Sequence, residues 1–245
     1  MKTTLKLLCA LGAVAVGTAL TSQAATIDVT TIGSSGSVGG AYFFGIDPQS
    51  TGTGVIDPFL REQNNGTELG INTSIASPPY DDKPGPWTHD LAISTLASVN
   101  YLGTSYYQFY LDANQVNNGN ISLTTLKIFT SATALGTVSA LSTLVAGSPV
   151  YDLGANVVNI AGNNGSGSGD MLMYIPASLI GTTGYLYLYA GFGVGDGNYA
   201  SNDGFEEWNA VEGPNTSVPD AANTVSLFGM TLVGLAAFRA KFKKA

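Results

Sequence analysis

Cysteine is nearly absent from this chain of 245 residues, and the only one, Cys9, lies in an apolar run near the N-terminus. Two lysines precede that run, and small residues follow it up to Ala24. This order is typical of a cleavable secretion signal, so we expect residues 1–24 to be removed and the mature chain to begin near Ala25. The mature chain then has no thiol, which excludes disulfides, thiolate metal sites and cysteine nucleophiles.

Basic residues are also scarce away from the two ends. The whole chain has a net charge of -8, and only Arg61, Lys83 and Lys127 carry positive charge between residues 7 and 238. A strongly acidic body repels nucleic acid and anionic lipid, so nucleic-acid binding is excluded as a function. The same composition suits solubility, cation binding or contact with neutral sugars.

Helical periodicity is hard to find between Ala25 and Val211, and short alternating segments bounded by Gly, Asn, Ser and Pro take its place. This pattern predicts an all-β fold, an antiparallel β-sandwich or jelly roll, in a single domain over 25–216. Glycine- and asparagine-rich turns are expected at 33–40, 64–66, 117–120 and 162–169. The expected strands are 25–31, 40–46, 69–73, 105–112, 123–130, 156–160, 170–175 and 184–192.

The last residues, 217–245, form a tail of three parts. A short polar motif at 218–224 overlaps an apolar segment at about 221–238, and a basic end follows at 239–245. The apolar segment predicts a C-terminal transmembrane helix, to complement the signal helix at the N-terminus. Because basic ends stay in the cytoplasm, we expect a membrane-anchored precursor with its acidic body on the far side of the membrane.

The tail resembles the PEP-CTERM class of sorting signals, and Val218, Pro219 and Asp220 are similar to its VPDSG-like variant. Ala221 and Ala222 stand where that variant has Ser and Gly. The resemblance implies recognition and cleavage by an exosortase-type enzyme in a Gram-negative bacterium that makes extracellular polysaccharide. The mature protein would then reach the cell surface or the extracellular matrix.

The body also resembles a recurrent ectodomain of bacterial proteins with such tails, over about residues 59–212. That family has no established activity, so the resemblance implies a secreted domain and no catalytic role. The segments that carry it are ELGINTS, YYQFYLDANQ, SLTTLKIF, VYDLG, GSGSGDMLMYIP, YLYLYAGFG and NDGFEEW.

Carboxylates in the C-terminal half suggest a calcium site, because Ca²⁺ binds six to eight oxygen ligands and is plentiful outside the cell. Solvated surface acids are the alternative interpretation. The candidate ligands are Asp203, Glu206 and Glu207, with Asp170 and Asp112 from neighbouring strands.

Aromatic residues suggest a second kind of site, because flat rings stack on the apolar faces of sugars. The candidates for glycan contact are Tyr185, Tyr187 and Tyr189, which alternate along one strand, and Trp208. The alternative is that the tyrosines form the half-buried face of a sheet.

Catalytic signatures are weak. His89 is the only histidine and has no nucleophile motif beside it. A glycosidase would need paired carboxylates, such as Asp112 with Glu206 or Glu207, at a separation that sequence does not give. The leading hypothesis is therefore a non-enzymatic structural or binding component of the cell surface or matrix. A calcium-assisted glycan-binding module and a polysaccharide-processing enzyme are the alternatives.

Overall fold

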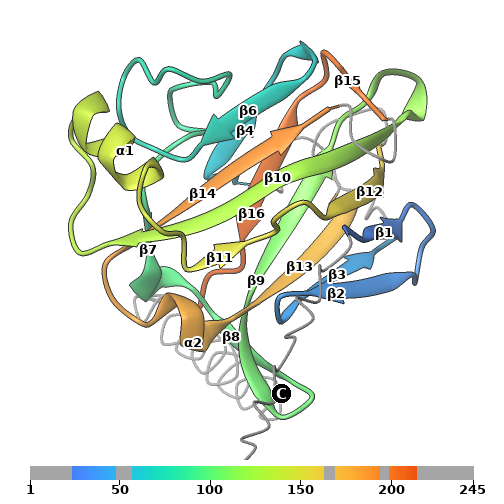
Figure 1. The fold of residues 1–245 in the computed structure, drawn as a ribbon, viewed down its shortest axis with the longest axis horizontal. Coiled ribbons are helices and arrows are strands. Elements are labelled where there is room, and N and C mark those ends of the chain that lie inside the picture. The colour runs from blue at the N-terminus through green and yellow to red at the C-terminus, as the bar shows by residue number, and fades with distance from the viewer. Residues whose placement is uncertain (1–23, 48–56, 163–168, 194–198, 214–245) are drawn as a thin grey trace, which may run out of the picture.

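The structure, a computed structural model, describes residues 24–47, 57–162, 169–193 and 199–213. These residues form an all-β fold built mainly from two sheets of seven strands each (Figure 1). Neighbouring strands pair in antiparallel fashion except for β1 and β12, which are parallel. The expected all-β class and the predominance of antiparallel pairing are confirmed.

Sheet A has the order β1-β12-β10-β14-β6, with β11 added to β10 and β7 to β14. Its longest strands, β10 and β14, pair over their full common length with a bulge between Leu123 and Thr125. The bounds are Thr26–Val29 (β1), Glu68–Ile71 (β6), Leu91–Ala92 (β7), Asn120–Ser131 (β10), Tyr151–Asp152 (β11), Val157–Ala161 (β12) and Tyr185–Phe192 (β14).

Sheet B has the order β2-β3-β13-β9-β16-β4, with β8 added to β9. A separate two-stranded sheet joins β5, Asn65–Gly66, to β15, Ser201–Asn202. The bounds in sheet B are Ser35–Val38 (β2), Ala41–Gly45 (β3), Leu60–Glu62 (β4), Ser98–Tyr101 (β8), Thr104–Ala113 (β9), Met171–Pro176 (β13) and Glu206–Ala210 (β16).

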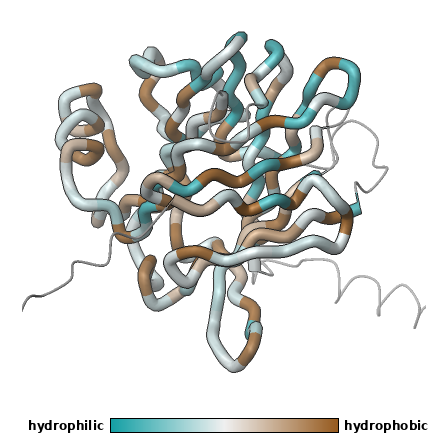
Figure 2. Tube along the Cα trace, turned by 45° about the vertical axis from the view of Figure 1, so that its right-hand side comes forward, coloured by the Kyte–Doolittle hydropathy of each residue, from teal (hydrophilic) through white to brown (hydrophobic). Residues whose placement is uncertain are grey.

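The main hydrophobic core takes alternate side chains from both sheets. Along β9, Tyr107, Phe109 and Leu111 belong to this core, whereas Gln108 and Tyr110 are half-buried on the opposite face. Because successive side chains of a strand point to opposite faces, each strand of sheet B presents one face to the core and one away from it. Figure 2 shows the result as hydrophobic residues recurring along the strands between more polar ones.

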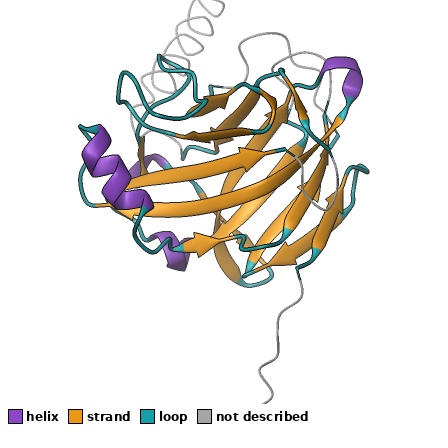
Figure 3. Ribbon diagram, turned by 45° about the horizontal axis from the view of Figure 1, so that its top comes forward, coloured by secondary structure: helices purple, strands orange, loops and turns teal. Residues whose placement is uncertain are grey.

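Sheet A is covered on its second face as well. Helix α1, Val138–Val145, begins at Thr137, whose side chain accepts a hydrogen bond from the backbone N–H of Ala140 at 3.2 Å. The helix lies against sheet A (Figure 3), and its Leu141 joins Ile71, Phe129 and Tyr187 in a smaller hydrophobic cluster. The other short helices are η1 (Ile93–Thr95), η2 (Val116–Asn118) and α2 (Ala177–Ile180).

All eight strands expected from the sequence are present, with ends shifted by a few residues. The turn expected at 33–40 is wrong in part, because 35–38 form β2 and pair with β3. Strand β16 and helix α1 were not anticipated. The described residues include no helix long and apolar enough to cross a membrane. The signal and the sorting tail at 217–245 lie outside the described residues.

Candidate functional site

The acids expected to bind calcium lie on two different faces of sheet B. Glu206 and Glu207 are consecutive on β16, so Glu206 points inward and Glu207 outward. Glu206 pairs with Glu62 of β4 across the sheet, and Glu207 pairs with Asp112 of β9. The strand therefore separates two neighbours that the sequence suggested could act together.

The inward acids form a buried carboxyl cluster of Glu62, Glu68, Asp82 and Glu206. These residues are 0 to 4% exposed, although none of them is apolar. Glu68 comes from β6 in sheet A and the other glutamates from sheet B, so the cluster spans the two sheets. Figure 1 places β4 and β6 at the opposite end of the molecule from the β8–β9 hairpin.

Burial dominates the electrostatics of this cluster. It raises the pKa of Glu206 to about 12, with a further contribution from the hydrogen bond and negative charge of Glu68. Burial likewise raises the pKa of Glu62 well above its usual value and that of Asp82 to about 6. A carboxyl group in such surroundings favours its neutral, protonated form.

The outward acids have a different environment. The Glu207 carboxylate forms an ion pair with Arg61 at 3.7 Å, and burial raises its pKa against the opposing effect of that arginine. The Arg61 guanidinium lies 3.9 Å from the ring centroid of Trp87 and 4.5 Å from that of Phe205. Such contacts between a cation and aromatic rings hold the Arg61 side chain, which comes from β4, in place beside β16.

The remaining acids named from the sequence are placed separately. Asp170 accepts a hydrogen bond from the backbone N–H of Ala113 at 2.8 Å, and its own N–H donates to the carbonyl oxygen of Leu111 at 2.7 Å. Asp203 is exposed in a left-handed turn conformation, with a φ of 72°. Within the described ranges, no three His, Cys, Asp or Glu side chains are grouped so that they could hold a metal ion.

The tyrosines of β14 and Trp208 do not form an exposed platform. Tyr187 and Trp208 are 0% exposed, so neither ring has a face free for a sugar, and this part of the glycan prediction is wrong. Tyr185 and Tyr189 are half-buried against the cluster that contains α1. The alternative interpretation, a face of the sheet that is covered, is the one the structure supports for these residues.

A different group of aromatic rings lies on the outward side of sheet B. We call it the aromatic face, and it comprises Tyr42 and Phe44 of β3, Tyr101 of β8, Tyr106 of β9 and Tyr174 of β13. Neighbouring ring centroids are 5.2 to 6.3 Å apart, and all the rings but Tyr106 are half-buried. The outward side of a sheet usually carries polar residues, so five contiguous rings there mark a candidate binding surface.

Polar groups and an exposed hairpin border the aromatic face. The Gln108 amide donates a hydrogen bond to the Tyr174 hydroxyl at 3.0 Å. The β8–β9 hairpin projects from the body in Figures 1 and 2, and Leu102 at its tip is 76% exposed with a φ of 50°. The surface thus combines aromatic rings with hydroxyl and amide groups.

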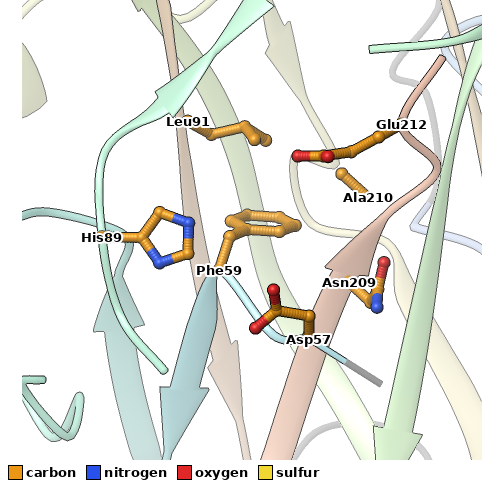
Figure 4. A pocket seen from close by; sticks show the side chains of 7 residues that line it. All are labelled: Asp57, Phe59, His89, Leu91, Asn209, Ala210 and Glu212. Atoms are coloured by element: carbon orange, nitrogen blue, oxygen red, sulfur yellow. The ribbon is translucent and has the colours of Figure 1, made fainter. Parts of the chain in front are cut away.

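His89 lines a small pocket with Asp57 and Glu212. The pocket has a volume of about 160 Å³, and Figure 4 shows the imidazole beside the Phe59 ring with the two carboxylates on other sides of that ring. The imidazole Nδ1 lies 3.2 Å from the carbonyl oxygen of Pro86, a contact in which the nitrogen donates. Ligand pockets typically have volumes of about 300 to 1,000 Å³, so this one is small.

Sequence reasoning missed the aromatic face because its members come from four strands. The alternation of Tyr42 with Phe43 and of Tyr174 with Met173 was visible, but which strands are neighbours was not. Comparison with known proteins adds no assignment: no family model matches the chain, and neither does any curated protein or solved structure.

Proposed function

We propose that this chain is an exported protein of the bacterial cell surface or extracellular matrix, with a non-enzymatic domain that binds neutral polysaccharide through the aromatic face. In this proposal the two sheets form a β-sandwich of the jelly-roll kind. The tail at 217–245 anchors the precursor until an exosortase-type enzyme cuts it near Val218, Pro219 and Asp220.

The aromatic face is the observation that carries the proposal. Its rings come from β3, β8, β9 and β13 and contact one another on the side of sheet B away from the main hydrophobic core, with Tyr106 buried and the other four rings half-buried. Aromatic rings supply large contact areas at little cost in side-chain entropy, and the tyrosine hydroxyls add hydrogen-bonding groups. A rigid sheet also holds these rings in fixed positions, which reduces the cost of ordering them on binding.

Charge favours a neutral ligand over an anionic one. The defined members of the aromatic face carry no charged side chain at neutral pH, whereas the body as a whole is strongly acidic. An anionic polysaccharide would be repelled by that net charge, whereas a neutral one would not. Because none of the five rings belongs to a carboxylate cluster, we expect binding that does not depend on calcium.

The polysaccharide-processing alternative has less support. It requires two carboxyl groups that face a substrate across a cleft. Asp112 and Glu206 point to opposite sides of sheet B, and the Glu207 carboxylate is engaged by Arg61. The described arrangement therefore favours binding over hydrolysis as the proposed activity.

Co-sedimentation of the purified protein with insoluble polysaccharides tests the binding proposal. We expect saturable binding to an uncharged glucan and to the host's own extracellular polysaccharide if that is neutral, with much weaker binding to an anionic polysaccharide. Equal binding in calcium and in chelator is expected. Absence of binding to every neutral polysaccharide would contradict the proposal, and binding lost in chelator would favour the calcium-assisted alternative.

The sorting part of the proposal has its own test in the producing cell. We expect Pro219→Ala, or deletion of the basic residues at 239–244, to leave a full-length precursor in the membrane fraction. A variant of Lys127, which lies on β10 far along the chain from the tail, serves as the control for loss of positive charge. Release of the tail variant at the normal rate would show that the tail is not a sorting signal.

A further inference from the structure

The buried carboxyl cluster is separate from the proposed ligand-binding surface. Its four acidic side chains lie close together and have few hydrogen-bond partners. Glu62, Glu68, Asp82 and Glu206 lie where β4, β6 and β16 meet, and Glu62 also forms an isolated β-bridge with Asp82. Ionised carboxylates are almost never fully buried unless they are paired with cations. The cluster must therefore be neutralised in some way.

Among the described residues, no lysine or arginine forms an ion pair with the cluster. The ion pairs found among the described residues join Arg61 to Glu207 and Lys127 to Asp152, and neither involves the cluster. The positive charge of Lys83 lowers the pKa of Asp82, but by less than the burial of Asp82 raises it. The other charged or titratable groups around the cluster are Asp81 and Tyr189. The negative charge of Asp81 raises the pKa of Glu62, and the negative charge of Glu62 raises the pKa of Tyr189.

Glu206 and Glu68 each have one carboxyl oxygen that accepts no hydrogen bond from a donor among the described residues. Glu206 Oε1 accepts a hydrogen bond from the Gln115 side-chain amide, and Glu68 Oε2 accepts one from the backbone N–H of Asn64 at 2.8 Å. The oxygens without a donor are Glu206 Oε2 and Glu68 Oε1. The two carboxyl groups nevertheless contact each other, which is a hydrogen bond only when one of them carries a proton.

Glu62 adds a third carboxyl group beside this pair. It is 0% exposed, and no hydrogen bond of ordinary geometry reaches either of its oxygens from the described residues. The Trp208 side chain lowers the pKa of Glu62, but by less than burial and the neighbouring acids raise it. Its Oε2 lies only 2.8 Å from the position that a Cβ at Gly70 would take, so the absence of a side chain at Gly70 makes room for it. Repulsion from an ionised Glu62 would add to the cost of ionising its neighbours.

We propose that Glu68 and Glu206 share one proton, with Glu62 neutral beside them, and that this proton clamps sheet A to sheet B. Glu68 belongs to sheet A and Glu206 to sheet B, so their hydrogen bond crosses between the sheets. When the proton is lost, two negative charges face each other in a buried site and the link becomes repulsive. Because folding must keep this proton bound, the stability that the clamp contributes is complete in acid and falls as the pH rises.

Substitution of Glu206 by Gln tests the clamp, because the amide supplies the donor without a titratable proton. In Glu206→Gln the new oxygen accepts from Gln115 and the new NH₂ donates to Glu68. We expect its melting temperature to match that of the wild type near pH 5 and to exceed it by roughly 10 °C near pH 8. Glu68→Gln supplies the same donor from the other side and should act similarly.

Glu207→Gln is the matched control, since it is the next residue on the same strand and points away from the cluster. It should keep most of the wild-type fall in melting temperature between pH 5 and 8, losing only the smaller contribution of Glu207 itself, because the cluster is unchanged. The proposal would be overturned if the melting temperature of the wild type did not fall between pH 5 and 8. The same conclusion would follow if the melting temperature fell equally in the wild type and in all three variants. The proposal would also be overturned if Ca²⁺ alone, added at pH 8, raised the melting temperature of the wild type by several degrees and Glu206→Gln abolished that increase. The cluster would then hold a cation.

Discussion

The free energy of unfolding should fall steadily as the pH rises from about 5 to about 8, because Glu206 keeps a proton in the folded chain that it loses when unfolded. Its pKa rises on folding from 4.5 to about 12. A group whose pKa is raised by folding contributes stability that is complete below the unfolded pKa and is lost as the pH rises towards the folded one. At neutral pH part of the stability contributed by Glu206 has therefore already been lost.

The magnitude follows from proton linkage. One proton held only by the folded chain changes the free energy by about 1.4 kcal/mol for each pH unit, so three units correspond to about 4 kcal/mol from Glu206 alone. Asp82, with a pKa raised from 3.8 to about 6, steepens the fall only below about pH 6. Since domains of this kind have total stabilities of about 5 to 15 kcal/mol, the effect is large enough to measure.

Urea unfolding at several pH values, monitored by tryptophan fluorescence, measures this slope directly. Trp208 lies in the main core beside the cluster, so its emission should report the transition. The denaturant dependence of the free energy should stay constant across the series, which would confirm that stability alone changes. A free energy that is constant within about 1 kcal/mol from pH 5 to 8, or that rises, would refute the reasoning.

Three further substitutions test the packing of the fold. Gly204→Ala should prevent folding or cost at least about 3 kcal/mol, because a Cβ there would overlap the carbonyl oxygen of Asn114. Gly136→Ala has open space around it and should change stability by less than about 1 kcal/mol in the same melting experiment. Tyr187→Phe should cost about 1 to 3 kcal/mol, because the buried hydroxyl donates to Asp90 at 2.8 Å and accepts from a backbone N–H at 2.9 Å. Unchanged stability in calorimetry would show that these two bonds contribute nothing.

Alternation along single strands was enough to predict much of the fold. The strand expected at 105–112 is present as β9, and its alternating Tyr107, Phe109 and Leu111 share the face that lies in the core. The same reasoning failed to show that β14 is covered on both sides. That cover comes from α1, whose start at Thr137 has a capping signal, although the apolar residues after it resemble a strand.

The sites were much less predictable, because they depend on which strands are neighbours. The sequence suggested that Glu206 and Glu207 bind calcium together or are solvated surface acids. Strand β16 instead places Glu206 in a buried cluster and Glu207 beside Arg61. Hydrophobic periodicity gives no reason to bury a glutamate. The partners of Glu206, Glu62 on β4 and Glu68 on β6, lie far from it in sequence and become neighbours only through sheet pairing and packing.

Paired binding isotherms on an uncharged glucan test the central claim most directly, by comparing Tyr174→Ala with Tyr185→Ala. Both tyrosines are half-buried on strands, but Tyr174 belongs to the aromatic face and Tyr185 lies on the outer side of sheet A. Provided that both variants keep their melting transitions, we predict about a tenfold loss of affinity for Tyr174→Ala and wild-type affinity for Tyr185→Ala. Equal affinities for the two variants, or a loss confined to Tyr185→Ala, would contradict the assignment of the aromatic face as the binding surface.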